Sequence, residues 1–142
     1  LFSLAGIKRM KMELEYEMLD FMISAPSQGV VAISSRVDDV ETKAILQKIN
    51  HKTTQICVEI ERNFLRTLEG GCTAPIGAIA VFEENKIIFS GRLNSLDGSK
   101  TINVVEEFEY DESENYGKKF AEFVLENGGK EMMEEIKKQI KE

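Results

Sequence analysis

The spacing of apolar residues changes once in the C-terminal two thirds of the chain, from a helical period to a strand period. Apolar side chains recur every four residues between residues 54 and 68, which predicts an amphipathic helix that ends at Gly70-Gly71. The period then becomes two in three successive runs, residues 76–83, 86–94 and 101–109. Turn sequences at Glu84-Asn85 and Leu96–Ser99 separate the runs, so we expect an antiparallel meander.

Helical spacing returns after the third strand. Residues 113–125 and 130–142 each place apolar side chains on one face, and Asn127–Gly129 ends the first of these helices. With the helix that precedes the strands, the pattern predicts an α+β fold. In it, three helices cover a three-stranded antiparallel sheet.

The first part of the chain carries a less regular pattern. Leu1–Met12 is typical of the end of a helix, residues 13–24 fit no element, and Ala25–Gly29 predicts a turn. The β-branched run Gly29–Ser34 predicts a buried strand.

A helix over about residues 40–49 should follow, capped by Asp38 or Asp39. Asn50–Thr53 interrupts the pattern, and Thr53 or Thr54 is expected to cap the next helix.

Composition places the chain among ordinary globular proteins and excludes some partners. Its 142 residues are 42% hydrophobic and 30% charged, with no apolar run long enough to span a membrane. The net charge of −7 argues against a nucleic-acid binder or a binder of anionic membranes. Residues 1–52 carry 7 basic and 7 acidic residues, whereas residues 53–142 carry 11 and 18. This step predicts a domain boundary near residue 52.

The residues with reactive side chains are few. Cys57, Cys72 and His51 are too widely spaced for a zinc site, so no metal is expected. A chain of this size needs no disulfide, and we expect reduced thiols and a cytoplasmic location. Cys57 shares the apolar stripe of its helix and is expected in the core. Cys72 follows two glycines on a loop, where it is either an incidental cysteine or a functional thiol.

The segment Leu68–Gly77, LEGGCTAPIG, closely resembles the cysteine loop of the porphobilinogen deaminase (hydroxymethylbilane synthase) family. Other family motifs occur in the same order: Ala5–Arg9 is similar to AGLKRL, Ala25–Gly29 to PAxGQG, Arg36–Asp39 to R-x-D-D, and Asn50-His51 to an Asn-His pair. The resemblance covers essentially the whole chain.

This resemblance implies a specific chemistry. The family joins four porphobilinogen molecules with loss of ammonia, and hydrolysis releases hydroxymethylbilane, a precursor of haem. Cys72 matches the cysteine that holds a dipyrromethane cofactor through a thioether, and a thiolate is a suitable nucleophile for that bond. Arg9 matches an arginine that binds substrate carboxylates, and Gln28 lies in the loop that approaches the cofactor.

The resemblance also implies that parts of the enzyme are absent from this sequence. The family's catalytic aspartate and its cluster of arginines lie upstream of the matching region, so no catalytic residue is predicted here. Residues 1–28 would end domain two, residues 29–52 would return to domain one, and residues 53–142 would form the C-terminal domain. The first two would be fragments of periplasmic-binding-protein-like α/β domains. Leu1 is not an initiator Met, which fits a fragment that is inactive alone.

Some residues depart from the family or are expected to act structurally. Ser27 stands where the family usually has Gly, and Ser34 where Glu is common. Glu61 and Arg62 are expected to be a structural pair that positions the cysteine loop, and His51 a structural contact.

Two partners and one alternative function follow. The partners are porphobilinogen, in the full enzyme, and the N-terminal domains. Without those domains, Gly29–Ile49 would expose apolar surface and favour a dimer. The alternative is a non-catalytic α+β module that binds a protein or acts as a redox thiol through Cys72. A dipyrromethane adduct, detected by its mass, would distinguish the deaminase hypothesis from this non-catalytic alternative.

Overall fold

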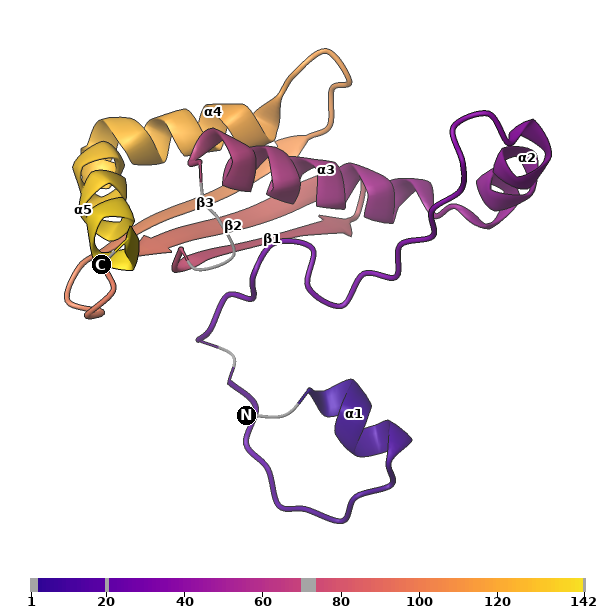
Figure 1. The fold of residues 1–142 in the computed structure, drawn as a ribbon, viewed down its shortest axis with the longest axis horizontal. Coiled ribbons are helices and arrows are strands. Elements are labelled where there is room, and N and C mark those ends of the chain that lie inside the picture. Colours follow the sequence, from indigo (N-terminus) through magenta and orange to yellow (C-terminus); the bar gives the residue numbers. More distant parts are fainter. Residues whose placement is uncertain (1–2, 20, 70–73, 142) are drawn as a thin grey trace.

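The computed structural model describes residues 3–19, 21–69 and 74–141. Figure 1 shows the elements in chain order. The helices are α1 (Leu4–Arg9), α2 (Val40–Ile49), α3 (Lys52–Thr67), α4 (Tyr116–Val124), a π-helical turn η1 (Leu125–Gly129), and α5 (Lys130–Lys141). The strands are β1 (Ile76–Glu83), β2 (Lys86–Asn94) and β3 (Thr101–Glu109). Within these described residues, no helix is long and apolar enough to cross a membrane.

The three strands form one antiparallel sheet in the order β1-β2-β3, as the period-two pattern predicts. Glu84 and Asn85 connect β1 to β2, and both have positive φ angles, +48° and +69°. Two left-handed residues are what a two-residue type I′ hairpin requires. The alternating pattern and this turn together fix which face of each strand points to the core.

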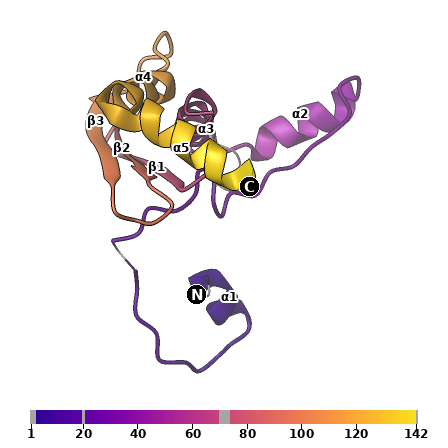
Figure 2. The same cartoon turned by 60° about the vertical axis from the view of Figure 1, so that its left-hand side comes forward.

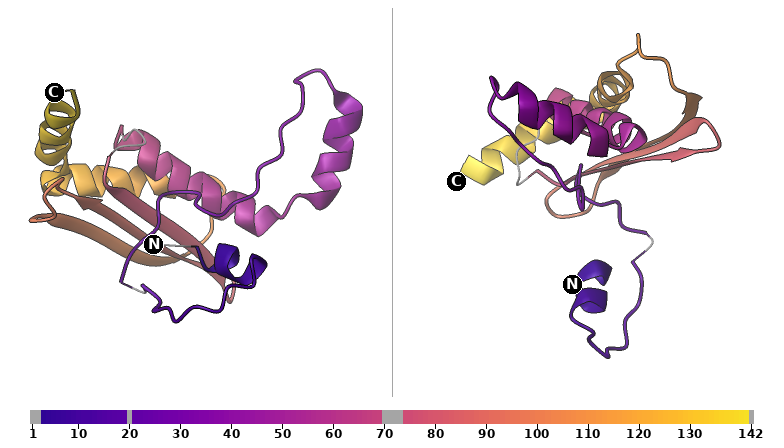
Figure 3. Two further views of the ribbon diagram at one scale, coloured as in Figure 1. Left: turned by 60° about the horizontal axis from the view of Figure 1, so that its bottom comes forward. Right: turned by 90° about the vertical axis from the view of Figure 1, so that its right-hand side faces the viewer.

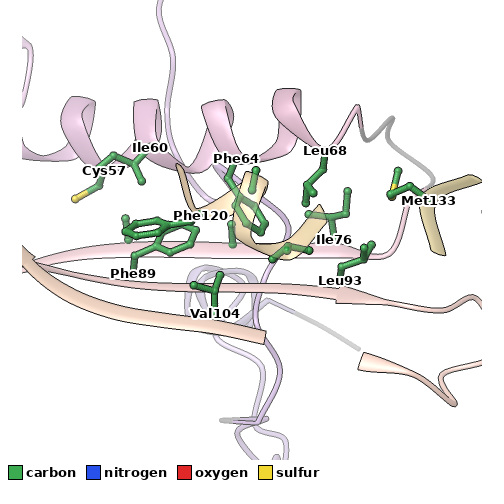
Figure 4. Close-up of a cluster of buried hydrophobic side chains, with 14 of the residues drawn as sticks. Cys57, Ile60, Phe64, Leu68, Ile76, Phe89, Leu93, Val104, Phe120 and Met133 are labelled. Carbon is green, nitrogen blue, oxygen red and sulfur yellow. The ribbon is translucent and has the colours of Figure 1, made fainter. Parts of the chain in front are cut away.

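Helices α3, α4 and α5 contribute the side chains that cover one face of the sheet, which confirms the predicted α+β class (Figure 2). Figure 4 shows the centre of this core, where Phe64 of α3 and Phe120 of α4 enclose Phe89 of β2. The ring centroid of Phe89 lies 5.2 Å from that of Phe64 and 4.8 Å from that of Phe120. Such aromatic pairs add to the free energy of burial.

Helices α3 and α4 approach each other closely at Gly117. A Cβ atom on Gly117 would lie 2.2 Å from the carbonyl oxygen of Ile60, so only glycine fits. Cys57 is buried on the same face of α3, as predicted, and burial raises the pKa of its thiol.

The segment that precedes α3 contributes no buried side chain to this core. Figures 1 and 3 show α2 extending away from the sheet. The strand predicted over Gly29–Ser34 does not form, and Val31 is 88% exposed. A strand requires a neighbour for its backbone hydrogen bonds, and among the described residues none lies beside this run. Helix α2 likewise buries none of its residues.

Helix boundaries follow the capping residues. Asp39 caps α2, as one of the two predicted candidates, through a 2.9 Å bond that its Oδ1 accepts from the Thr42 N–H. The predicted cap of α3 is wrong: His51 takes that place, and its Nδ1 accepts from the Thr54 N–H at 3.4 Å. Asn115 caps α4, so that helix begins three residues later than the apolar pattern indicates.

Candidate functional site

A buried carboxylate on α3 joins three segments of the chain. Glu61 is 7% exposed. Its Oε1 accepts the Ala80 N–H at 2.8 Å, and its Oε2 accepts the Ser27 N–H at 2.6 Å. Ala80 belongs to β1, and Ser27 to the turn Ala25–Gly29. Two charge-assisted bonds of this kind offset the cost of burying a carboxylate.

The next residue of α3 holds the same turn from the exposed side. The Arg62 Nε donates to the Ser27 Oγ at 3.2 Å. Ser27 has a φ of +63°, in the left-handed region that glycine adopts without strain. This backbone angle explains why a glycine suits the position, and the bond from Arg62 is what a serine adds there. We call Glu61, Arg62 and Ser27 the turn clamp.

The residues just before the turn lie along the outer edge of β1. The Ala78 N–H donates to the Ser24 carbonyl at 3.0 Å, and the Arg92 Nη1 donates to the Phe21 carbonyl at 3.2 Å. A Cβ atom on Gly77 would lie 2.8 Å from the Ile23 carbonyl oxygen. Residues 21–27 are therefore attached to the C-terminal body, although they precede the composition step near residue 52.

The structure places the predicted site residues in separate settings. Gln28 is exposed within the clamped turn, and its N–H donates to the Ala25 carbonyl at 3.1 Å. Arg9 is exposed in the last turn of α1, which lies apart from the sheet in Figures 1 and 2. Arg9 and Gln28 thus belong to different parts of the molecule. Cys72 lies outside the described residues.

Glu61, Arg62 and His51 each make contacts within the described fold. Glu61 and Arg62 hold the turn Ala25–Gly29 and β1, while their predicted influence on the cysteine loop concerns residues outside the described part. His51 bonds to Thr53 and Thr54 at the start of α3. Across the described ranges, no three His, Cys, Asp or Glu side chains gather as a metal site would require.

A cleft of about 880 Å³ lies between residues 30–33, α2 and α3. Apolar side chains from residues 30–33 line one side of it. Three cationic side chains, Lys43, Arg62 and Arg66, and the carboxylate of Glu59 also line it, together with the imidazole of His51. The cleft therefore combines an apolar wall with polar groups of both charges.

Sequence reasoning missed one ion pair next to the cysteine loop. Lys137 on α5 donates to the Oε2 of Glu69, three residues before Cys72. The hydrogen bond and the charge of Lys137 lower the pKa of Glu69. No local spacing in the sequence links two residues so far apart along the chain.

Comparisons with known proteins agree with this architecture. The family model described as porphobilinogen deaminase, C-terminal domain, matches residues 55–127. The porphobilinogen deaminase of Carboxydothermus hydrogenoformans is 36% identical over 100% of this chain and 47% of the relative. That of Desulforamulus reducens is 35% identical over 96% of this chain and 45% of the relative. That of Chloroherpeton thalassium is 39% identical over 72% of this chain and 33% of the relative.

The chain spans less than half the length of these curated relatives. The family model covers most of α3, the whole sheet, α4 and the first residues of η1, and it ends before α5. The similarity of sequence extends over the clamped turn as well, because the first relative aligns with the whole chain. The chain belongs to the porphobilinogen deaminase family.

Proposed function

We propose that this chain forms the cofactor-attachment part of a hydroxymethylbilane synthase. In the whole protein, the activity is the joining of four porphobilinogen molecules with loss of ammonia, followed by hydrolysis to hydroxymethylbilane. The observation that carries this proposal is the family match over residues 55–127, which includes Cys72, Glu61 and Arg62. Such a transferase serves tetrapyrrole and haem biosynthesis.

Cys72 is the residue that we propose to hold a dipyrromethane through a thioether. Such a group, when bound, supplies the pyrrole to which porphobilinogen units are added. The chain has two cysteines, and Cys57 is buried in the core with a raised thiol pKa. Because a nucleophilic thiol must be accessible and ionised, Cys57 is unsuited to the attachment. The unsuitability of Cys57 supports the assignment to Cys72, the other cysteine of the chain.

Two further side chains fit a ligand that carries carboxylates. Arg9 and Gln28 are both exposed, and guanidinium and amide N–H groups donate hydrogen bonds to carboxylates. We propose that Arg9 binds substrate carboxylates and that Gln28 contacts the cofactor. The turn clamp would then hold Gln28 at a fixed place relative to α3.

The chain alone is proposed to lack turnover, since it contains no catalytic residue by family resemblance. Three of its arginines already bond within the chain: Arg62 to Ser27, Arg66 to Asn63, and Arg92 to Asn103 and Phe21. Its net charge of −7 would also repel a polycarboxylate substrate. Measurable hydroxymethylbilane formation by these 142 residues would contradict this part of the proposal.

The missing partners are proposed to be the N-terminal domains. Residues 1–28 would complete domain two, residues 29–52 would return to domain one, and residues 53–142 would form the third domain. The exposed apolar side chains of residues 30–49 support this arrangement, because contiguous apolar surface usually marks an interface. A dimer through Gly29–Ile49 is the arrangement proposed where those domains are absent. A cytoplasmic location fits the buried reduced thiol of Cys57.

Mass spectrometry tests the attachment directly. The whole protein that contains this chain should show a dipyrromethane adduct on the peptide carrying Cys72. The Cys72→Ser variant should lose the adduct, whereas the control Cys57→Ser should keep it. An unmodified Cys72 in the whole protein would refute the attachment, and the lack of hydroxymethylbilane formation by the same protein would favour the non-catalytic alternative.

A further inference from the structure

The bend between α4 and α5 contains an asparagine that is followed by a glycine. Asn127 is the one asparagine of the sequence that precedes a glycine, Gly128. Both residues are exposed, and both depart from helical backbone angles, with φ −96° and ψ 31° at Asn127 and φ +98° at Gly128. Figure 1 shows that the chain turns sharply here from α4 into α5. The pair therefore lies at an exposed bend, outside regular helical geometry.

The side-chain amide of Asn127 stabilises the end of α4. Its Nδ2 donates a hydrogen bond to the Phe123 carbonyl at 2.8 Å. The last carbonyls of a helix have no partner within the helix and carry partial negative charge, so an N–H donor stabilises them. A carboxylate at the same place would offer no donor and would repel the carbonyl. The contribution of this contact therefore depends on whether residue 127 carries an amide or an acid.

The same bend determines where α5 begins. Met132, Met133 and Ile136 of α5 are buried in the core that the sheet shares with α3 and α4. Gly129, the residue just before α5, is buried too, and a Cβ atom on it would lie 2.5 Å from the Val124 carbonyl oxygen. Because the backbone is packed this closely, a change in its path at residue 127 would displace the side chains that α5 buries.

The backbone nitrogen of Gly128 is open to attack on the neighbouring amide. Among the described residues, a Cβ atom placed on Gly128 would meet only the Ile102 Cδ1, at 3.9 Å. A glycine nitrogen can approach the side-chain carbonyl carbon of the preceding asparagine because no side chain shields it. The hydrogen bond that holds the Asn127 amide is exposed, so local opening of the bend exchanges it for water.

We propose that Asn127 is a site of spontaneous deamidation and that this modification loosens the attachment of α5 to the core. The Gly128 nitrogen forms a bond to the Cγ atom of Asn127, the bond from Cγ to Nδ2 breaks, and the Gly128 proton leaves with the amide nitrogen as ammonia. Water then opens the cyclic imide. Opening at Cγ gives aspartate, whereas opening at the main-chain carbonyl gives isoaspartate, which adds one carbon atom to the backbone.

Both products weaken the bend. Aspartate loses the donor to the Phe123 carbonyl and places a negative charge at the end of α4, beside Glu126. Isoaspartate also carries a carboxylate, and it lengthens the backbone just before the closely packed Gly129. The rest of the core keeps its own contacts between α3, α4 and the sheet. The modification thus acts on α5 alone and is independent of the proposed attachment at Cys72.

Incubation of the 142-residue chain in mildly alkaline buffer, followed by trypsin digestion and mass spectrometry, tests the modification. Trypsin releases residues 120–130, in which Asn127 is the only asparagine, and residues 101–118, which contain Asn103 and Asn115 as internal controls. The first peptide should lose its amide and give separable aspartate and isoaspartate forms, while the second keeps both amides. An intact amide at residue 127, or equal loss from the control peptide, overturns the proposal.

Asn127→Asp reproduces the aspartate product and tests the effect on α5 directly. Hydrogen exchange in the peptides of α5 should be about three- to tenfold faster in this variant than in the original chain. Asn127→Gln keeps an uncharged amide and should stay within about twofold of the original chain. A peptide from the centre of β2 should exchange equally in all three proteins. The effect on α5 is refuted if Asn127→Asp exchanges like the original chain, if Asn127→Gln is equally fast, or if β2 accelerates as well.

Discussion

Helices α2 and α3 are neighbours in the sequence and carry similar apolar spacing, but only α3 is buried. Helix α3 packs Ile60 and Phe64 against the sheet, whereas no residue of α2 is buried. The same contrast separates residues 52–141 from residues 28–50 as a whole. Periodicity identifies the apolar face of an element, and burial requires a partner surface that the chain must supply.

The boundary between these two regions is not where the charge composition changes. Residues 21–27 lie before the composition step, but the turn clamp and the edge of β1 attach them to the C-terminal body. Hydrogen bonds with Ala78, Glu61, Arg62 and Arg92 thus hold this segment, although none of its side chains is buried. The contrast between the regions concerns side-chain burial, and four predictions follow from it.

The largest expected effect comes from the buried aromatic core. Phe89→Ala should lower the free energy of unfolding by about 3–5 kcal/mol, because it leaves a cavity between α3, α4 and the sheet. The matched control Ile45→Ala, at a side chain that is 62% exposed on α2, should change it by less than about 0.5 kcal/mol. Urea unfolding followed by circular dichroism measures both. A cost above about 1 kcal/mol for Ile45→Ala would show that α2 has a buried partner.

The next effect tests how residues 21–27 are attached to the C-terminal body. Glu61→Gln should cost about 1–3 kcal/mol, since an amide offers one acceptor oxygen and its NH₂ group would face a second backbone donor. Glu59→Gln, on the exposed side of α3, should be nearly neutral. Thermal unfolding gives the stability, and chymotrypsin cleavage after Phe21 should accelerate only in Glu61→Gln. Equal behaviour of the two variants would exclude the clamp.

Ser27 allows a smaller and sharper comparison. Ser27→Ala loses the acceptor for Arg62 and keeps the strained φ of +63°, so it should cost about 1 kcal/mol. Ser27→Gly also loses that bond but relieves the strain, and its change should stay below about 0.5 kcal/mol. Denaturant unfolding of the two variants side by side measures the difference. A glycine variant less stable than the alanine variant would contradict the left-handed assignment.

The smallest effects concern two carboxylates near the surface, one in each region. Hydrogen bonds from Ser95 and from the Ser99 N–H and hydroxyl lower the pKa of Asp97 to about 2. Bonds from the Thr42 N–H and hydroxyl lower the pKa of Asp39, the cap of α2. Because both folded-state pKa values lie below the unfolded value of 3.8, the stabilisation is present above that pH and is lost as the pH falls through each folded-state pKa, which is about 2 for Asp97.

Titration of the carboxyl carbons by nuclear magnetic resonance checks both values. Asp97→Asn should flatten the stability curve of the body below pH 4, about the unfolded pKa of the carboxyl. An ordinary pKa for Asp39 beside a lowered pKa for Asp97 would show that α2 does not persist without a buried face.

The sequence predicts a helix or strand well where the segment that it packs against or pairs with is also its neighbour in the chain. The bounds of β1, β2 and β3 follow from alternation and turn residues, because each strand pairs with its neighbour in the chain. Gly29–Ser34 has an equally strong β-branched pattern and forms no strand, because pairing is a property of two segments. His51 replaces the predicted threonine caps because an imidazole nitrogen also accepts a backbone N–H.

The candidate site is less predictable than the fold. Family motifs single out Cys72, Arg9 and Gln28, but they give no distances, and Arg9 lies on a helix apart from Gln28. Glu61 and Arg62 could be found as a pair by their motif, whereas their contacts with Ser27 depend on the tertiary fold. Lys137 and Glu69 meet only because α5 folds back onto the end of α3, and neither residue stands out locally.

The close approach at Gly117 bears on which sequence changes this fold tolerates. Every side chain larger than a hydrogen atom would meet the Ile60 carbonyl, so a replacement must push α4 away from α3. Phe120 lies one turn further along α4 and stacks on Phe89, so the displacement would pass directly into the aromatic core. The packing of these helices therefore depends on the absence of a Cβ atom at residue 117. We expect proteins that descend from this chain to keep glycine at this position.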